Sequence, residues 1–457
     1  MNTEQRNYTS SLIVLILLFF TWGFITSLND ILTPHLKGVF NLSHLQANLV
    51  MFAFFTAYFV GSLIYFIASL TVGDPIAKFG YKRAIVFALI LSAIGCVLFY
   101  PAAELKSFTF FLAALACISF GLTILQIAAN PYVALLGKPE TASSRLNLTQ
   151  GFNSFGTTIG PVLGGYFIFK FFGNLGAESV KIPYLILAGL CLVLTIFIAF
   201  AHLPALTENE KIEKKPIALK HSNLFFGMLA IFFYVGAEVT VGSNLISYMT
   251  LPDIGGFTNE IASRHLAFFW GGAMIGRFLG FISLGEMKPI KKYTSMFIVM
   301  VALFIIIFLI SRLEFTEVAI YLIFMAINFV GFIIGKSNPH RTLSLFVVIA
   351  MILTLIGILF TGRIAMWSVL SLGLFNSIMW ANIFTLAIDG LGEYTSQGSS
   401  LLVMMILGGA IVPLVQGAIA DATNMHLSLI APLISYSYLL FYGIEGYKKN
   451  IFGKEKA

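Results

Sequence analysis

The sequence alternates long apolar runs with short polar or charged connections along its whole length. A helix needs about 20 apolar residues to cross the roughly 30 Å of hydrocarbon in a bilayer. Runs of this kind lie at 11–40, 45–73, 84–102, 107–137, 146–172, 182–202, 223–251, 260–285, 294–311, 317–335, 343–360, 365–390, 396–420 and 427–447. The pattern predicts an all-α polytopic membrane protein with about 14 transmembrane helices.

The composition agrees with this pattern. The 457-residue chain is 58% hydrophobic and 10% charged, whereas about a quarter of the residues in a soluble domain are charged. The first apolar run begins near Ser11 and lacks the short apolar core and small-residue cleavage site of a signal peptide. We therefore expect it to be retained as the first transmembrane helix.

One connection is much longer and more polar than the others. It contains TENEKIEKKPIALKHSN, residues 207–223, and it divides the apolar runs into six before it and eight after it. The sequence thus predicts an N-terminal six-helix bundle over 1–204, a cytoplasmic linker over 205–222 and a C-terminal bundle over 223–457.

An internal repeat explains the uneven division. Five residues recur at an offset of 252: Ala129, Asn130, Gly156, Pro161 and Gly165 as Ala381, Asn382, Gly408, Pro413 and Gly417. Two more recur at an offset of 213: Phe20 and Gly23 as Phe233 and Gly236. The offsets differ by 39 residues, about the length of a helical hairpin, so we infer that two helices are inserted around 292–340.

Two pseudo-symmetric six-helix halves joined by a linker resemble the major facilitator superfamily, whose substrate sites lie near the membrane midplane between the halves. The connection GDPIAKFGYKR, residues 73–83, partly resembles the loop signature of that superfamily. The matching positions are Gly73, Lys78, Gly80, Lys82 and Arg83. Ala77 replaces the usual Asp, and Asp74 lies three residues earlier.

The net charge of +7 is explained by basic residues in the connections on one side of the membrane. With a cytoplasmic N-terminus, 20 of the 27 Lys and Arg residues fall on the cytoplasmic side, which is the positive-inside bias. The seven on the outer side are Lys37, Lys106, Lys170, Lys181, Arg264, Arg312 and Arg363. We therefore expect both termini in the cytoplasm and no nucleic-acid partner.

Residue patterns typical of an enzyme are scarce. The three cysteines, Cys96, Cys117 and Cys191, lie in apolar runs without paired spacing. No two histidines have the spacing of metal ligands on a helix. We expect neither a metal nor another cofactor, and no nucleophile–base pair favours an intramembrane enzyme. A receptor or scaffold would leave the polar residues within the apolar runs unexplained.

Two acidic residues fall inside the apolar runs, where a charge costs about 2.5–3.5 kcal/mol. Asp30 lies in the first run, and Glu238 lies in the middle of the seventh, its counterpart in the second half. Arg277 lies in the eighth run. Each acid has a structural interpretation as an internal ion-paired group. Each can instead couple transport to a cation, because a carboxylate can take up and release a proton or bind sodium.

Amide side chains recur at helical spacing in other runs. An amide offers two donors and two acceptor lone pairs, which suits vicinal hydroxyls, and an indole ring suits the apolar face of a sugar. Hydrogen bonds between helices explain such amides equally well. The candidate substrate-binding residues are Gln126 with Asn130, Gln150 with Asn153, and Asn376 with Trp380.

Four segments of the chain resemble the fucose–galactose–glucose:proton symporter family, in particular its bacterial glucose/galactose transporters. They are FFTWGFITSLNDIL (19–32), ILQIAANPYVALLGKPETASSRLNLTQGFNSFG (124–156), FYVGAEV (233–239) and GLFNSIMWANIFTLAI (373–388). The resemblance covers nearly all the predicted helices. It implies symport of a hexose such as glucose or galactose with a cation across the bacterial inner membrane.

The resemblance also implies roles for single residues. Asp30 matches an important Asp of the fucose:proton members, and Gln126 stands where those members carry a second carboxylate. Those members have Gln at the position of Glu238. We therefore expect Glu238 to be the second coupling carboxylate and Gln126 to be a neutral sugar contact. Gln150 and Asn153 match amides that line the fucose cavity.

Several alternatives stay open at this stage. The coupling ion is expected to be a proton, with sodium as the alternative. Fucose or another sugar is an alternative substrate, because Ala381-Asn382 stands where glucose/galactose relatives have Pro-Thr. An uncoupled facilitator or an exporter would have the same fold. A monomer in the lipid bilayer is expected.

Overall fold

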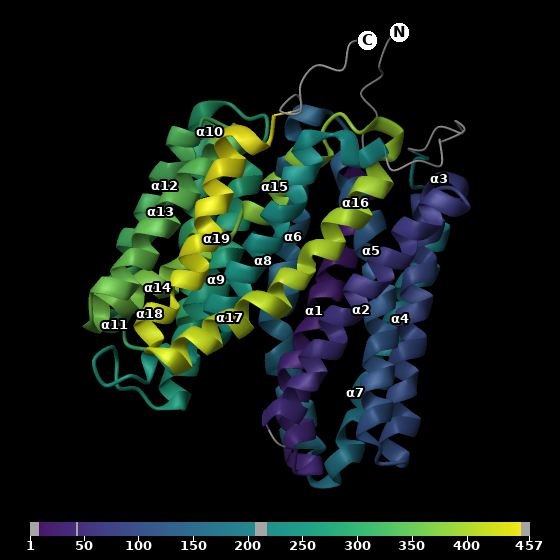
Figure 1. The fold of residues 1–457 in the computed structure, drawn as a ribbon, viewed down its shortest axis with the longest axis horizontal. Helices are drawn as coiled ribbons and strands as arrows, with labels where there is room; N and C mark the ends of the chain where they lie inside the picture. Colours follow the sequence, from purple (N-terminus) through teal and green to yellow (C-terminus); the bar gives the residue numbers. More distant parts are fainter. Residues whose placement is uncertain (1–8, 43, 206–216, 449–457) are drawn as a thin grey trace. The chain divides into compact units, whose positions relative to one another are not determined.

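The computed structural model describes residues 9–42, 44–205 and 217–448. These residues fold into helices, with no β-strand among them (Figure 1). The helices before the long connection are α1 (Thr9–Phe40), α2 (His44–Thr71), α3 (Pro75–Phe79), α4 (Tyr81–Glu104), α5 (Phe108–Leu135), α6 (Ala142–Gly165) and α7 (Lys181–Phe200).

The part after the connection has more helices. They are α8 (Ser222–Met249), α9 (Asn259–Ser283), α10 (Pro289–Ser311), α11 (Phe315–Val318), α12 (Tyr321–Gly335), α13 (Pro339–Leu359), α14 (Gly362–Asn376), α15 (Met379–Ile388), α16 (Thr395–Met404), α17 (Gly408–Ala422), α18 (Met425–Ser428) and α19 (Ile430–Phe441).

The described residues contain 12 helical spans that are long and apolar enough to cross a membrane. Two of the predicted spans are not among these 12. They correspond to α12, which has 15 residues, and to α6, whose 24 residues include many polar side chains. The helices thus agree with the predicted number of about 14, and the chain is a multi-pass membrane protein as its apolar pattern predicts.

The structure departs from the sequence prediction inside two of the spans. The span predicted at 365–390 is interrupted by a turn at Ser377 and Ile378, which separates α14 from α15. The hydroxyl of Ser377 donates a hydrogen bond to the carbonyl of Leu374 at 2.6 Å, a local bond that competes with the regular helix. The span predicted at 396–420 changes to a 3₁₀ turn over Met405–Leu407, between α16 and α17.

Helix packing has the same pattern before and after the long connection. In the first half α4 packs against α5 and α7, and α2 packs against α5. In the second half α13 packs against α14 and α19, and α9 packs against α14. Helices α10 and α12 have no counterparts in this scheme. Helix α10 packs against α9, and α12 packs against α9, α13 and α14. Both lie in the stretch where the sequence predicts an insertion.

Two glycines of the repeat make equivalent close approaches between helices. A Cβ atom on Gly156 of α6 would lie within 3.0 Å of the Phe20 carbonyl oxygen of α1. A Cβ atom on Gly408 of α17 would lie equally close to the Phe232 carbonyl oxygen of α8. Only glycine fits at such distances, because real Cβ contacts are longer. The same helix pair is therefore packed in the same way in both halves.

The chain folds into two compact units, each assembled from segments that are separated in the sequence. The first comprises Met1–Pro139, Phe155–Ala218 and Leu391–Met404. Within it, the amide of Gln397 donates a hydrogen bond to Ser69 Oγ at 3.3 Å. The second comprises Glu140–Ser154, Leu219–Gly390 and Met405–Ala457. The bundle boundaries predicted at 204 and 223 come from the repeat and the linker, and they stay predictions.

The loop between α2 and α4 has a local reason for its sequence. Gly73 and Gly80 have φ angles of +92° and +82°, a region that glycine adopts without strain. Asp74 caps α3 by accepting hydrogen bonds from the backbone N–H groups of Ile76 at 2.8 Å and Ala77 at 3.2 Å. Burial raises the pKa of the Asp74 carboxyl.

Candidate functional site

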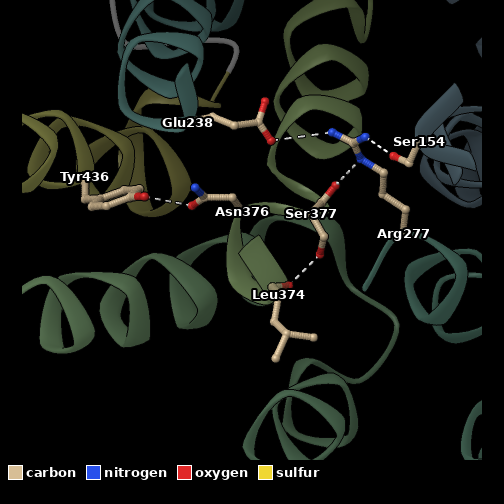
Figure 2. Close-up of polar contacts among 7 residues, drawn as sticks. All are labelled: Ser154, Glu238, Arg277, Leu374, Asn376, Ser377 and Tyr436. Carbon is tan, nitrogen blue, oxygen red and sulfur yellow. Dashed lines mark hydrogen bonds and ion pairs between the residues drawn. The ribbon is translucent and has the colours of Figure 1, made fainter. Parts of the chain in front are cut away.

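Glu238 lies at the middle of α8 and is ion-paired. Its Oε1 atom is 3.5 Å from Nη2 of Arg277, which comes from α9 (Figure 2). The two side chains are 14% and 12% exposed. A charge in a membrane-spanning bundle is tolerated when it is paired in this way. The structural interpretation of Glu238 as an ion-paired residue thus has a defined partner, and a coupling role would have to act through that pair.

Arg277 connects four elements of the second unit. Besides Glu238, its Nε atom donates a hydrogen bond to the Ser377 carbonyl at 3.1 Å. Its Nη1 atom donates to the hydroxyl of Ser154 on α6 (Figure 2). The planar guanidinium has five fixed donors, so the position of its head group depends on all three partners. The turn between α14 and α15 is therefore linked to Glu238 through one side chain.

Asn376 is the last residue of α14 and lies beside this turn. Its Oδ1 atom accepts a hydrogen bond from the hydroxyl of Tyr436 at 2.9 Å (Figure 2). Its Nδ2 atom is buried and makes no hydrogen bond with any residue that the structure describes. The same holds for Nε1 of Trp380 in α15. Buried donors are normally satisfied, so these two are available for a ligand or for water.

Tyr234 adds a third polar atom to this group. It lies one turn before Glu238 on α8, and its hydroxyl interacts electrostatically with Glu238 and Arg277. That hydroxyl is buried and makes no hydrogen bond of regular geometry within the described chain. Its ring centroid is 6.5 Å from that of Trp380. The second unit therefore gathers an ion pair, two buried donors without a hydrogen bond in the described chain, and a buried hydroxyl that lies beside the pair.

The sequence places Asn376 and Trp380 on one helical face, and the structure changes the basis of that prediction. A spacing of four residues brings side chains together only along a continuous helix. Asn376 ends α14, and Trp380 is the second residue of α15, beyond the turn. Their relation is therefore set by the turn, whose bonds to neighbouring helices could not be inferred from spacing.

Gln150 and Asn153 lie on α6, in the part that belongs to the second unit. Both side chains are buried, with 5% and 8% of their surface exposed. Asn153 directly precedes Ser154, the partner of Arg277. Asn147, three residues before Gln150 on the same helix, donates to the Ser143 carbonyl at 2.8 Å. Helix α6 thus brings two predicted residues into the unit that holds Glu238.

The other predicted residues belong to the first unit. Gln126 and Asn130 are buried on α5, and Asn130 Nδ2 donates to the Gln126 carbonyl at 3.0 Å. The Gln126 side chain interacts with the hydroxyl of Tyr58 on α2, which also interacts with Trp22 on α1. Asp30 lies on α1, and its side chain is outside the described part of the structure.

Sequence reasoning missed Tyr234, Tyr436 and Ser154 and did not include Arg277 among the site residues. Tyr234 carries a usable signal, since it precedes Glu238 by four residues and so shares its helix face. Arg277 carries another, because an intramembrane charge requires a partner. Tyr436 comes from a distant helix and has no comparable signal in the sequence.

No group of three or more His, Cys, Asp or Glu side chains within residues 9–42, 44–205 and 217–448 could hold a metal ion. The arrangement offers hydrogen-bond donors, acceptors and one ion pair, a set suited to binding a polar ligand.

Comparison with known proteins gives a consistent result. The profile of the Major Facilitator Superfamily matches residues 12–339. The glucose/galactose transporter of Brucella abortus biovar 1 (strain 9-941) is 44% identical over 453 residues, which cover 98% of this chain and 96% of that protein. The putative glucose/galactose transporter of Helicobacter pylori (strain ATCC 700392 / 26695) is 35% identical over 463 residues, covering 98% of this chain and 99% of that protein.

A solved structure agrees with these matches. The crystal structure of the E. coli fucose:proton symporter FucP has a TM-score of 0.74 and 29% sequence identity, covering 96% of this chain and 98% of that one. All three relatives are named as transporters and none as an enzyme. On the profile match and the two full-length relatives, this chain belongs to the major facilitator superfamily.

Proposed function

We propose that this protein is a cation-coupled symporter of a hexose, glucose or galactose, that works by alternating access. The observation that carries the proposal is the Glu238–Arg277 ion pair, which lies among buried polar atoms that have no hydrogen bond in the described chain. The names of the relatives from Brucella abortus and Helicobacter pylori support the sugar class.

The free donors suit sugar hydroxyls. Asn376 Nδ2 and Trp380 Nε1 can each donate to a hydroxyl oxygen, and the hydroxyl of Tyr234 can donate or accept. The indole ring of Trp380 offers an apolar surface to a sugar face. In the first unit Gln126 and Asn130 are the proposed sugar contacts. Gln150 and Asn153 complete the proposed set from α6.

The ion pair offers a means of coupling. Protonation of Glu238 would remove its attraction to Arg277 and leave the guanidinium held by the Ser377 carbonyl and Ser154. Proton binding would thereby change the surroundings of Asn376, one residue before Ser377. We propose a proton as the coupling ion and Asp30 as the second coupling carboxylate. Sodium bound by the same carboxylates is the alternative.

The cellular setting belongs to the same proposal. We infer the bacterial inner membrane from the resemblance to bacterial sugar transporters. The distribution of Lys and Arg supports both termini in the cytoplasm. We also propose a monomer that needs no cofactor and binds no nucleic acid. L-Fucose is a second candidate substrate, favoured by the likeness to the E. coli fucose:proton symporter. An uncoupled facilitator or an exporter would bind the same sugar.

Transport in proteoliposomes tests the proposal. Labelled glucose and galactose should exchange in counterflow without an energy source, and a proton gradient should drive uphill accumulation of the transported hexose. Asp30→Asn and Glu238→Gln should lose accumulation and keep part of the counterflow. Glu104→Gln is a matched control, since Glu104 is paired with Lys181 at 2.5 Å outside the proposed site. Absence of hexose counterflow in the wild type would refute the proposal.

Accumulation separates the other transport modes. Counterflow without uphill accumulation under proton or sodium gradients would identify a facilitator. Accumulation of L-fucose in preference to glucose and galactose would favour the second substrate. Full accumulation by Asp30→Asn would remove Asp30 from the coupling mechanism.

A further inference from the structure

The inserted hairpin, residues 289–335 from α10 to α12, has an unexpected set of polar contacts. It has no counterpart in the first half, so the simplest expectation is an apolar addition that faces lipid. Much of α10 fits this expectation, since Ile298, Ile305 and Leu309 are exposed apolar residues. Some polar side chains of the hairpin do not. They make specific bonds to α9 and α14, the helices that carry Arg277 and Asn376.

Two of these bonds fix the hairpin to α9. The hydroxyl of Tyr321 donates to the carbonyl of Phe268 at 2.8 Å. Oε1 of Glu317 lies 3.3 Å from Nε2 of His265, whose side chain is fully buried. A third bond holds the hairpin at the other end of α9, where Nζ of Lys292 donates to the carbonyl of Ser283 at 2.9 Å. These contacts fix the hairpin to α9 on both sides of Arg277 in the sequence and are structural.

Asn328 makes a different contact. It is fully buried on α12, a helix whose other residues are apolar apart from Tyr321. Its Nδ2 atom donates to the carbonyl oxygen of Leu374 at 3.0 Å. The same oxygen accepts the bond from the hydroxyl of Ser377. A polar amide placed in so apolar a helix is costly unless it is bonded, so its position is specific.

The Leu374 carbonyl belongs to the last turn of α14, where helical carbonyls lose their regular partners. It comes two residues before Asn376 and three before Ser377. The Ser377 carbonyl in turn accepts the bond from Nε of Arg277 (Figure 2). A single chain of bonds thus leads from Asn328 through the turn to Arg277 and Glu238.

The turn is also confined from the side of α9. A Cβ atom on Gly276 would lie within 3.0 Å of both the Ser377 side chain and the Leu374 carbonyl oxygen. Helix α9 therefore touches the turn directly, and Asn328 reaches the same carbonyl from the hairpin. Because α9 and Asn328 both contact the turn, the turn can move little, and the position of Asn376 is restrained with it.

We propose that Asn328 is a positioning residue and that the inserted hairpin braces the turn between α14 and α15. By holding the Leu374 carbonyl, Asn328 fixes where Asn376 presents its free amide and where the Ser377 carbonyl holds Arg277. The bond from Asn328 to the Leu374 carbonyl restrains the turn whether or not a sugar is bound. Its effect on sugar binding rests on the proposed function.

Hydrogen exchange tests the brace without any sugar. Asn328→Leu keeps the size of the side chain and removes the donor. Tyr321→Phe is the matched control, because it removes one bond from the same hairpin to α9 and leaves the turn alone. Amide exchange in peptides covering 371–384 should be about threefold to tenfold faster in Asn328→Leu than in Tyr321→Phe. Equal exchange in this segment for both variants would overturn the brace.

Hexose binding tests the consequence. The dissociation constant for the transported hexose should rise about threefold to tenfold in Asn328→Leu and stay near the wild-type value in Tyr321→Phe. Faster exchange together with unchanged affinity would overturn the link between the brace and the sugar site. If the wild type binds no hexose, the proposed function fails, and the exchange comparison still decides whether Asn328 holds the turn.

Discussion

Arg277 Nη2 and Glu238 Oε1 are 3.5 Å apart, an ion pair in which Glu238 Oε1 accepts no hydrogen bond from the described residues. The guanidinium directs its better-aligned donors to the Ser377 carbonyl and to Ser154. The two charges thus attract each other without being locked together by directional bonds. Such a pair can separate when one partner is neutralised, which is the property a coupling site requires.

The first prediction concerns the stability of this pair. Removing one partner of a buried pair costs about 3–5 kcal/mol, because the other charge stays uncompensated, whereas removing both is often nearly neutral. Glu238→Gln and Arg277→Gln should therefore each lower the Tm of the purified protein. The double variant should recover most of the loss.

The control for this cycle is the pair of Lys181 with Glu104, whose carboxylate is half exposed. Glu104→Gln should lower the Tm much less than Glu238→Gln does, because an ion pair open to solvent contributes little to stability. Strictly additive losses in Glu238→Gln and Arg277→Gln would show that the two side chains do not interact energetically.

The second prediction concerns Gln126. If its side chain contacts the sugar, Gln126→Ala removes bonds worth about 0.5–1.5 kcal/mol each. The hexose dissociation constant should then rise about tenfold, the factor that corresponds to 1.4 kcal/mol. Thr123→Val is the control, since the Thr123 hydroxyl bonds the Ser119 carbonyl within the same helix. Unchanged affinity in Gln126→Ala would assign its amide to contacts within the bundle, such as that with Tyr58.

Much of the fold follows from the sequence because membrane helices have a simple physical requirement. Each must hide its backbone from lipid and span the same thickness, so apolar length alone locates most of them. The repeat also predicts an insertion around 292–340, the stretch that contains most of α10 and all of α12, and this assignment stays a prediction. The turn at Ser377 was missed because it depends on bonds from Arg277 and Asn328, which lie far away in the sequence.

The site was predicted in part for a related reason. Glu238 is conspicuous as an acid in an apolar run, whereas Asn376 and Trp380 were proposed from a helical spacing that the turn at Ser377 and Ile378 interrupts. What the sequence does not contain is which polar atoms are left over after packing. Packing gives the Oδ1 of Asn376 to Tyr436, a residue that spacing arguments cannot connect to it, and leaves its Nδ2 without a hydrogen bond in the described chain.

The third prediction concerns three glycines of the internal repeat, Gly156, Gly408 and Gly417. Gly156 and Gly408 are packed against backbone carbonyls of neighbouring helices, whereas a Cβ atom on Gly417 would meet nothing within 4 Å. Gly156→Ala and Gly408→Ala should each destabilise the protein by about 1–3 kcal/mol through overpacking. Gly417→Ala should be neutral or stabilise it by up to about 1 kcal/mol, because alanine favours the helix.

Thermal unfolding of the three alanine variants in one detergent measures this difference. The comparison is internal, since all three substitutions add one methyl group to a helix. If Gly417→Ala lost as much stability as Gly408→Ala, the close contact between helices would not explain why glycine is needed at position 408.

The last prediction concerns Asp74, whose pKa is raised by burial in the loop before α3. A carboxyl whose pKa is higher in the folded than in the unfolded protein stabilises the fold fully below its unfolded pKa, about 3.9. That contribution is lost as the pH rises through the folded pKa. Asp74→Asn keeps an acceptor for the N–H groups of Ile76 and Ala77 and does not ionise.

The Tm of Asp74→Asn relative to the wild type should therefore increase as the pH rises from about 4 to about 7. Asp74→Ala separates titration from capping. It loses the helix cap, worth about 1 kcal/mol, at every pH, and like Asp74→Asn it lacks the titration. The Tm difference between the two variants should thus be constant while both change relative to the wild type. A difference between Asp74→Asn and the wild type that is flat or falls with pH would contradict the effect of burial, because only a carboxyl disfavoured in its charged form produces the rise.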